Sequence, residues 1–180
     1  MNYYISDLHI GHENILKHDH RLFRDLEEMS WEIVHRWNSA VSHRDSVYIL
    51  GDFAWKNAEG LEVLQQLSGR KFLILGNHDK PTEEMKAYFE WIKDYAAIED
   101  NGVQVVLCHY PIANWYNQYK GAVHLYGHVH ISKDYIALKA YREICRQLNI
   151  PYESYNVGCM MPYMDYTPRT LARIRETAEK

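Results

Sequence analysis

The stretch KFLILGNHD, residues 71–79, joins a short, mostly apolar run to the polar turn Gly76-Asn77-His78-Asp79. A run of this length, bounded by turn residues, is typical of a buried strand. The same arrangement recurs at four other places. Runs at residues 3–6, 46–50, 103–107 and 122–126 end in Asp7-Leu8-His9, Gly51-Asp52, Cys108-His109 and Gly127-His128-Val129-His130. Because loops that leave neighbouring strands converge at the carboxyl ends of an α/β sheet, we expect these five signatures to meet in one site.

Seven side chains in these signatures carry hard oxygen or imidazole nitrogen donors. They are Asp7, His9, Asp52, Asn77, His109, His128 and His130. A single ion that keeps room for water uses three or four protein ligands, whereas two ions that share one carboxylate use about seven. Each residue alone has an ordinary explanation, such as a turn or a helix cap. Their joint occurrence after predicted strands favours a two-metal site.

The order of the blocks, D-x-H, G-D, G-N-H-D, H and G-H-x-H, resembles the calcineurin-like metallophosphoesterase superfamily. The match spans residues 7–130, and it is specific because five ordered blocks must coincide, each behind a predicted strand. The run GHEN at residues 11–14 also resembles a subgroup of small bacterial and phage phosphoesterases. The resemblance implies a four-layer αββα sandwich with two facing mixed β-sheets and the site at the carboxyl ends of strands. The pattern by itself predicts only an α/β or α+β fold.

The resemblance also implies a role for each residue of the predicted site. The first ion would bind Asp7, His9 and His130, the second would bind Asn77, His109 and His128, and Asp52 would bridge the two as the catalytic carboxylate. His78 is then left without a metal. In the family this histidine faces the substrate and stabilises or protonates the leaving oxygen, a role that suits imidazole because it titrates near neutral pH. Asp79 is expected to orient His78.

The predicted pair of ions indicates hydrolysis of a phosphate ester. Two divalent ions about 3.5–4 Å apart can share a hydroxide, lower its pKa and offset charge on a phosphoryl group. We therefore expect this bridging hydroxide to be the nucleophile, with no covalent protein intermediate. The mixed carboxylate, amide and imidazole donors accept Mn, Fe, Zn, Co or Ni. Mn is the preferred expectation.

Five further residues are candidate substrate contacts, either near the first signature or on the aromatic loop that leaves the predicted strand ending at His109. They are His12, Asn14, Arg21, Tyr110 and Trp115. Arg21 is a candidate phosphate clamp, and the aromatic residues are candidates for stacking on a flat leaving group. Alternative roles remain open: a helix-starting turn for Asn14, a solvated surface for Arg21 and cover for the sheet edge for the aromatic rings.

Four functions are compatible with these motifs. The preferred one is a phosphodiesterase that acts on a small, nucleotide-like diester, because no arginine pair is evident that would bind the dianion of a monoester. A phosphomonoesterase or nucleotide phosphatase is the closest alternative. A non-catalytic scaffold of the same fold is disfavoured because all the ligand residues and His78 are retained. A nuclease is disfavoured by the net charge of −4.

Length and composition place the chain among ordinary single-domain proteins. With 180 residues, 47% hydrophobic and 24% charged, we expect one domain over residues 1–180 and no membrane partner. The three cysteines, Cys108, Cys145 and Cys159, are widely spaced, which together with an N-terminus that enters a strand predicts a cytoplasmic protein with reduced thiols. A small phosphate ester is the expected partner and a long nucleic acid is not. No pattern indicates an oligomeric state.

Apolar spacing predicts several helices between the strands. Residues 22–41 carry a capping pair, Asp25 and Glu28, and residues 58–68 and 82–95 repeat the helical period, the latter with Thr82 as N-cap. Residues 132–151 are expected to be an inserted helix, acting either as a lid or as core packing. A final helix is expected from Pro168 with Thr167 as its cap, after a strand at residues 155–157.

Overall fold

Two four-stranded sheets form the centre of the protein in a computed structural model that describes residues 1–178. The first sheet is parallel throughout and has the order β1 (Asn2–Ile5), β2 (Ser46–Leu50), β3 (Arg70–Ile74) and β4 (Phe89–Lys93). The second sheet is mixed and has the order β5 (Tyr95–Asp100), β6 (Val103–Cys108), β7 (Val123–Tyr126) and β8 (Ser154–Asn156). Only the β5–β6 pair is antiparallel in that sheet.

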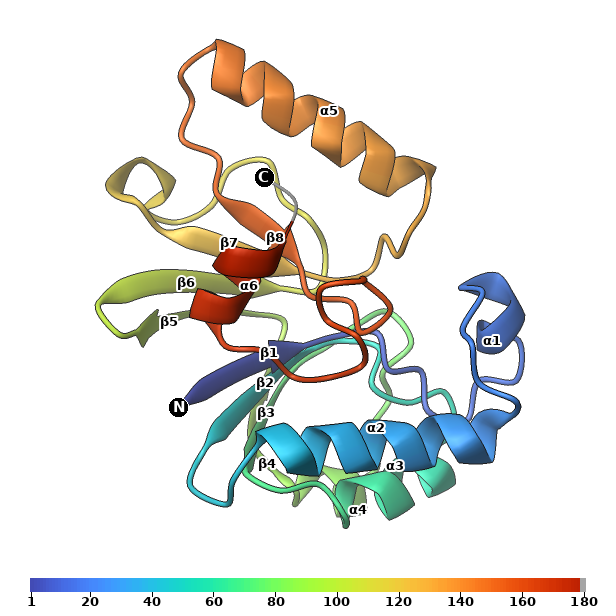
Figure 1. Ribbon diagram of the computed structural model, residues 1–180. Helices are drawn as coiled ribbons and strands as arrows, with labels where there is room; N and C mark the ends of the chain where they lie inside the picture. The colour runs from blue at the N-terminus through green and yellow to red at the C-terminus, as the bar shows by residue number, and fades with distance from the viewer. Residues whose placement is uncertain (179–180) are drawn as a thin grey trace.

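Helices cover the outer faces of the two sheets (Figure 1). The elements are α1 (Ile15–His18), α2 (Leu26–Ala40), α3 (Asn57–Leu64), α4 (Glu83–Lys86), η1 (Gln118–Lys120), α5 (Lys133–Gln147) and α6 (Leu171–Thr177). Figure 1 shows α2, α3 and α4 below the first sheet and α5 beyond the second. The predicted sandwich is therefore confirmed, with one correction: the first sheet is parallel and only the second is mixed. No described helix is both long enough and apolar enough to cross a bilayer.

Helix α2 forms where the sequence predicts it. The Asp25 carboxylate accepts a hydrogen bond of 2.8 Å from the backbone N–H of Glu28, which caps the first turn. Met29, Ile33 and Trp37 are spaced by four residues and fully buried, so one apolar stripe packs the helix onto the first sheet. Leu22, included in the predicted helix, precedes it and is 98% exposed.

The helix predicted over residues 82–95 is wrong beyond its first turn. Thr82 does cap α4, but α4 ends at Lys86 and the chain then enters β4. The positions of Phe89 and Ile92 fit a helical period, yet these residues and Trp91 are aromatic or β-branched and pair with β3. Strand β5 was also missed. The apolar spacing was therefore insufficient to separate a short helix from an edge strand.

The two sheets are joined at the carboxyl ends of β1 and β8. The backbone N–H of Ser6 donates to the carbonyl of Val157 (2.9 Å), and that of Cys159 donates to the carbonyl of Ser6 (2.9 Å). Tyr4 and Arg169 pair across the free edge of β1. The C-terminal segment thus covers an edge that would otherwise expose unpaired backbone groups.

The last two predicted helices form, with corrections. Helix α5 lies within the predicted insertion, but Cys145 is its only buried residue, so it is not plain core packing. Its N-terminal end borders the cleft described below, and the rest of the helix extends away. Helix α6 starts at Leu171 and is capped by Thr170, three residues later than predicted. Pro168 and Thr167 instead belong to the turn before the Tyr4–Arg169 bridge.

His124 on β7 holds the aromatic loop against the second sheet and is fully buried. Its Nδ1 lies 3.2 Å from the carbonyl of Val106, and its Nε2 lies 3.3 Å from the backbone N–H of Ile112. A neutral ring with the proton on Nδ1 satisfies both partners. Burial lowers the pKa of His124 to about 4, against the raising effect of the Val106 carbonyl.

We predict that protonation of His124 destabilises the fold below neutral pH. Because the unfolded chain binds the proton with a pKa near 6.5, stability is fully present above that pH and falls as the pH drops towards 4. The loss should be on the order of 3 kcal/mol. The free energy of unfolding in urea is measured for the wild type and for His124→Asn between pH 7 and 4.5. Because all other groups titrate in both proteins, the difference between the two pH profiles isolates the contribution of His124. Parallel pH profiles for the two proteins would contradict the prediction.

Candidate metal centre

Five of the predicted ligands lie in the left-handed region of backbone conformation. Their φ angles are 57° for Asp7, 53° for His9, 51° for Asp52, 70° for His128 and 45° for His130. Non-glycine residues rarely adopt this region, and it costs about 1–3 kcal/mol where it persists. Such turns immediately after strands redirect the chain so that the side chains point inward. Five of the seven predicted ligands thus carry backbone strain.

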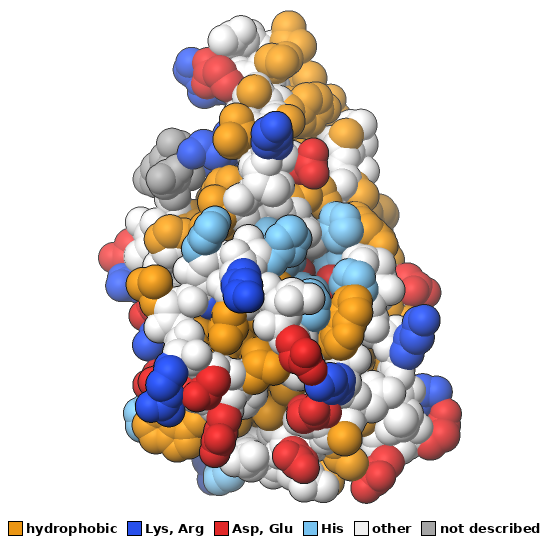
Figure 2. Space-filling view, turned by 90° about the vertical axis from the view of Figure 1, so that its right-hand side faces the viewer, with side chains coloured by type: hydrophobic (Ala, Val, Ile, Leu, Met, Phe, Trp, Pro, Cys, Tyr) orange, Lys and Arg blue, Asp and Glu red, His pale blue; other side chains and the backbone are white. Residues whose placement is uncertain are grey.

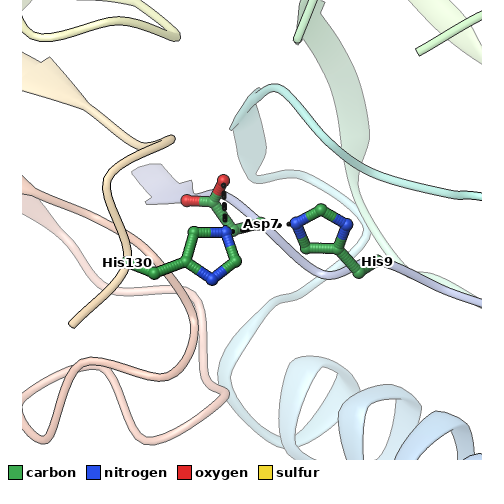
Figure 3. Close-up of side chains that lie close together, drawn as sticks. All are labelled: Asp7, His9 and His130. Atoms are coloured by element: carbon green, nitrogen blue, oxygen red, sulfur yellow. Dashed lines mark hydrogen bonds and ion pairs between the residues drawn. The ribbon is translucent and has the colours of Figure 1, made fainter. Parts of the chain in front are cut away.

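Asp7, His9 and His130 form the first ligand group (Figure 3). Each offers one donor atom, and these atoms all lie within 4.8 Å of one another. Dashed lines in Figure 3 join His130 to each of the other two. Its Nε2 atom lies 3.6 Å from Asp7 Oδ1 and 3.2 Å from His9 Nε2. Asp7 and His9 come from the loop after β1 and His130 from the loop after β7, so the first and second sheets both contribute.

Asp52, His109 and His128 form the second group, again with donor atoms within 4.8 Å. His109 Nδ1 lies 2.8 Å from the carbonyl of Leu50, which leaves Nε2 facing Asp52 Oδ2 at 3.5 Å. Asn77 joins this group because its Oδ1 lies 3.1 Å from the same Nε2. Asp52 Oδ2 is also 3.7 Å from His9 Nε2 of the first group. The carboxylate of Asp52 therefore lies between the two groups.

The charged groups at this centre are buried. Burial raises the pKa of Asp7, against the lowering effect of His130 and His109. Burial also lowers the pKa of His9, so that ring is neutral and able to donate a lone pair. For Asp52 burial opposes ionisation, but the hydrogen bond and charge of His109 and the backbone N–H of His78 lower its pKa. Asp52 thus presents a carboxylate and His9 a neutral imidazole. For His109 and His130 burial opposes protonation, but their hydrogen bonds with Asp52 and Asp19 raise the pKa of the two rings.

This donor set fits two divalent cations. Imidazole Nε2 atoms of His9 and His130 face each other across 3.2 Å with a carboxylate beside them, an arrangement that a shared cation would stabilise. The two groups contain six imidazole and carboxylate donors and no lysine or arginine, a set that suits divalent cations better than a salt bridge. His9 Nδ1 is buried without a hydrogen-bond partner among the described residues. It marks a polar group that burial leaves unsatisfied at this centre.

Glycine is required where the loops approach the carboxylates. A Cβ atom on Gly76 would lie 2.2 Å from Asp52 Oδ1, and one on Gly127 would lie 2.5 Å from Asp7 Oδ2. No ordinary contact is that short, so any larger residue would displace the carboxylate. The G-N-H-D and G-H-x-H blocks therefore begin with glycine because backbone and ligand must nearly touch.

His78 and Asp79 are held differently from each other. The His78 ring lies at the cleft surface, with its centroid 5.8 Å from that of His9, and its backbone N–H donates to Asp52 Oδ1 at 3.0 Å. Asp79 accepts instead from the backbone N–H groups of Asp52, Phe53 and Gly76 at 2.8–2.9 Å. Its observed contacts thus tie two loops together, in place of the predicted contact with the His78 ring.

Arg21 is neither part of the cleft lining nor on the surface. The residue is 5% exposed, and its guanidinium donates to the carbonyls of Asp7 (2.8 Å) and Leu8 (2.9 Å). It also pairs with the carboxylate of Asp19 at 2.8 Å. Sequence reasoning missed this function because an arginine with no periodic neighbours gives no sign that it will be buried.

Asp19 is a second residue that the sequence analysis missed. Its Oδ1 lies 2.6 Å from Nδ1 of His130, while its Oδ2 accepts from Arg21. Burial opposes its ionisation, but the hydrogen bond to His130 and the charge of Arg21 lower its pKa. A carboxylate on Nδ1 fixes the ring and directs Nε2 at the centre, a common arrangement behind histidine ligands. The only signal in the sequence was a polar HDHR run after a short helix.

A cleft of about 350 Å³ opens over the two ligand groups, and Figure 2 shows histidine side chains gathered around this hollow. Of the remaining predicted contacts, His12 lines it. Tyr110 packs its ring against His128 with centroids 4.7 Å apart. Asn14 is the exposed N-cap residue of α1 and is not part of the lining.

Trp115 is buried against the second sheet and does not line the cleft. It is 7% exposed, packs with Val106 and Ala122, and donates its indole N–H to the carbonyl of Ala122 at 2.8 Å. The alternative of cover for the sheet is the correct one. Trp55, which the sequence analysis did not select, lines the cleft instead.

We predict that Asp19→Asn weakens metal binding while the chain still folds. Loss of the carboxylate frees the His130 ring and leaves Arg21 without its counter-charge, so Mn²⁺ affinity should fall about 10- to 100-fold and stability by about 3 kcal/mol. Calorimetric titration of chelated protein with Mn²⁺ and urea unfolding measure the two effects. Asp134→Asn is the matched control, because Asp134 is an exposed carboxylate in the same cleft. Unchanged Mn²⁺ affinity in Asp19→Asn would contradict the positioning role.

Comparison with known proteins agrees with this geometry. The calcineurin-like phosphoesterase superfamily domain matches residues 3–176. The chain is 35% identical over 131 residues to uncharacterized protein MJ1445 of Methanocaldococcus jannaschii, covering 71% of this chain and 68% of that protein. It is 31% identical over 159 residues to the gene 66 protein of Mycobacterium phage L5, covering 71% and 76%. The crystal structure of AQ665, a protein of unknown function from Aquifex aeolicus, aligns over 98% of both chains with a TM-score of 0.74 and 31% identity. The chain belongs to the calcineurin-like phosphoesterase superfamily.

Proposed function

We propose that this protein is a metal-dependent phosphodiesterase that hydrolyses small, nucleotide-like diesters. Membership of the family and the two candidate ligand groups support a phosphoesterase with a metal site. The preference for a diester rests on one observation: none of the described residues that line the cleft is a lysine or an arginine. A diester carries one negative charge, whereas a monoester carries up to two and usually requires cationic side chains.

The position of Arg21 supports the same preference. Its guanidinium is occupied by the carboxylate of Asp19 and by two backbone carbonyls. Its side chain is therefore committed behind the ligands, away from any substrate phosphate. Binding of the phosphate would depend on the metal ions and on the histidines of the cleft.

The ligands are proposed to divide as the two groups suggest. Asp7, His9 and His130 would hold one ion, Asn77, His109 and His128 would hold the other, and Asp52 would contact both. When bound, two divalent ions would lower the pKa of water and offset the charge on the phosphoryl group. We retain Mn as the preferred metal, with Fe, Zn, Co and Ni as alternatives.

His78 is proposed to give a proton to the leaving oxygen. Its ring lies at the cleft surface beside His9, and its backbone N–H is anchored on Asp52. The loop that carries the ring is further fixed because Asp79 binds the backbone N–H of Gly76 and Asp52. A positioned imidazole typically contributes about 10²- to 10⁴-fold to the rate.

The other candidate functions are disfavoured by particular observations. A scaffold would have no need for strained backbone at five ligand positions. A nuclease for long substrates would require a continuous strip of basic side chains, and the chain has a net charge of −4.

We also propose a reducing, cytoplasmic compartment for this protein. Three free cysteines, two of them buried, support that proposal.

We predict that chelated protein reloaded with Mn²⁺ hydrolyses bis(p-nitrophenyl) phosphate faster than p-nitrophenyl phosphate. Release of p-nitrophenol at equal substrate concentrations measures the ratio of kcat/KM values. A higher value for the monoester would replace the proposed activity with a phosphomonoesterase. Absence of turnover of both substrates with every metal tested would favour the scaffold.

Two variants separate metal binding from proton transfer. Asp52→Asn should lose turnover together with metal content, because the carboxylate between the two ligand groups is removed. His78→Ala should keep both ions and lose about 10²- to 10⁴-fold in kcat. Elemental analysis and steady-state kinetics make the comparison, with His43→Ala, an exposed histidine outside the cleft, as the control. Full activity in His78→Ala would show that another group protonates the leaving oxygen.

A further inference from the structure

Trp55 forms an aromatic wall beside the ligand groups. Its indole stacks on the His12 ring with centroids 4.3 Å apart and planes at 14°, and it lies 4.8 Å from the ring of His78. The side chain is 48% exposed, so much of the indole remains open to the cleft. An open indole next to the proposed proton donor is a surface on which a flat group can pack.

The backbone holds this wall in place. The N–H of Trp55 donates to the carbonyl of Ile10 at 2.8 Å, and Ala54 forms a parallel bridge with Ile10. The loops after β1 and β2 are thereby linked directly below the indole. Trp55 also follows Asp52 by only three residues, so the distance between the aromatic surface and the metal ligands is set by a short, bonded segment.

The wall differs in chemistry from the floor of the cleft. The floor consists of histidines and carboxylates, whereas the exposed side chain of Ile131 accompanies Trp55 as an apolar lining residue. A phosphate bound over the ligands would place one ester group near His78 and therefore near Trp55. A flat, aromatic group would bury apolar surface there, and a bare sugar or alkyl group would gain much less.

We propose that Trp55, supported by His12, is the specificity-determining residue that binds the flat aromatic part of the substrate, so that nucleosides and aryl groups are preferred over sugars and alkyl groups. This inference rests on the proposed function, because it assumes that the phosphate binds over the two ligand groups. It assigns a substrate class, aromatic phosphodiesters, to an activity that the ligand residues alone leave open.

Binding of a matched pair of phosphates tests the inference without turnover. AMP and ribose 5-phosphate carry the same sugar and phosphate, and only AMP carries a base. Calorimetric titration of Mn²⁺-loaded wild-type protein should give a Kd for AMP about 10-fold lower than that for ribose 5-phosphate. In Trp55→Ala the two Kd values should become nearly equal. In Trp55→Phe most of the preference for AMP should remain, because phenylalanine retains an aromatic face.

Trp31→Ala is the matched control. Trp31 is also exposed, by 60%, and also stacks on a histidine, His35, with centroids 5.1 Å apart and planes at 3°, but it lies outside the cleft. This variant should keep the 10-fold ratio. Equal affinities for AMP and ribose 5-phosphate in the wild type would overturn the inference, as would a ratio that survives in Trp55→Ala.

The outcomes distinguish this inference from the proposed function. Turnover of bis(p-nitrophenyl) phosphate with equal binding of AMP and ribose 5-phosphate overturns the role of Trp55 and leaves the phosphodiesterase intact. Preferential binding of AMP that depends on Trp55, without turnover of any ester, supports the aromatic subsite and overturns the hydrolytic function.

Discussion

The burial of two carboxylates, Asp7 and Asp52, between the carboxyl ends of two sheets is the constraint on which the rest of the site depends. A charge in the protein interior is costly unless hydrogen bonds or opposite charges compensate it. Asp7 accepts from the backbone N–H of His128 and from the hydroxyl of Ser6, and Asp52 accepts from the backbone N–H of His78. Each of these donors belongs to a loop that carries a ligand. The loops therefore converge because the carboxylates need their N–H groups.

The convergence of the loops on the two carboxylates explains the left-handed backbone, the glycines and the buried arginine near the site. Left-handed backbone at five ligands turns the chain sharply at the strand ends, and Gly76 and Gly127 let two loops approach the carboxylates to a distance that no Cβ allows. Arg21 binds the carbonyls of Asp7 and Leu8 from behind, so the first loop is held on both its carboxylate and its backbone. The strain at these turns is sustained by the packed strands that precede them.

The interior and the surface of the cleft perform different tasks. Behind the ligands, Asp19 and Arg21 form a buried polar pair that orients His130, which gives the first group a defined geometry. In front of them, His12, Trp55 and His78 form a continuous set of rings on one side of the opening. Arg21 thus contacts residues behind the ligands and does not face the cleft. The side of the cleft that a leaving group would contact is formed mainly by aromatic and imidazole rings.

The sequence by itself determined the strands that precede each signature, the candidate donor residues that these strands bring together and the cap of α2. These depend on local pattern and spacing, because an apolar run followed by a polar turn forms the same unit wherever it packs. The sequence alone could not distinguish β4 from a helix, because the pairing of Phe89 and Trp91 with β3 is a non-local contact. Only the tertiary structure decided that Arg21 and Trp115 are buried and that Asp19 and Trp55 flank the ligands. These positions depend on which loops meet after the sheets pack, and residues that lie 111 positions apart, such as Asp19 and His130, have no shared local signal.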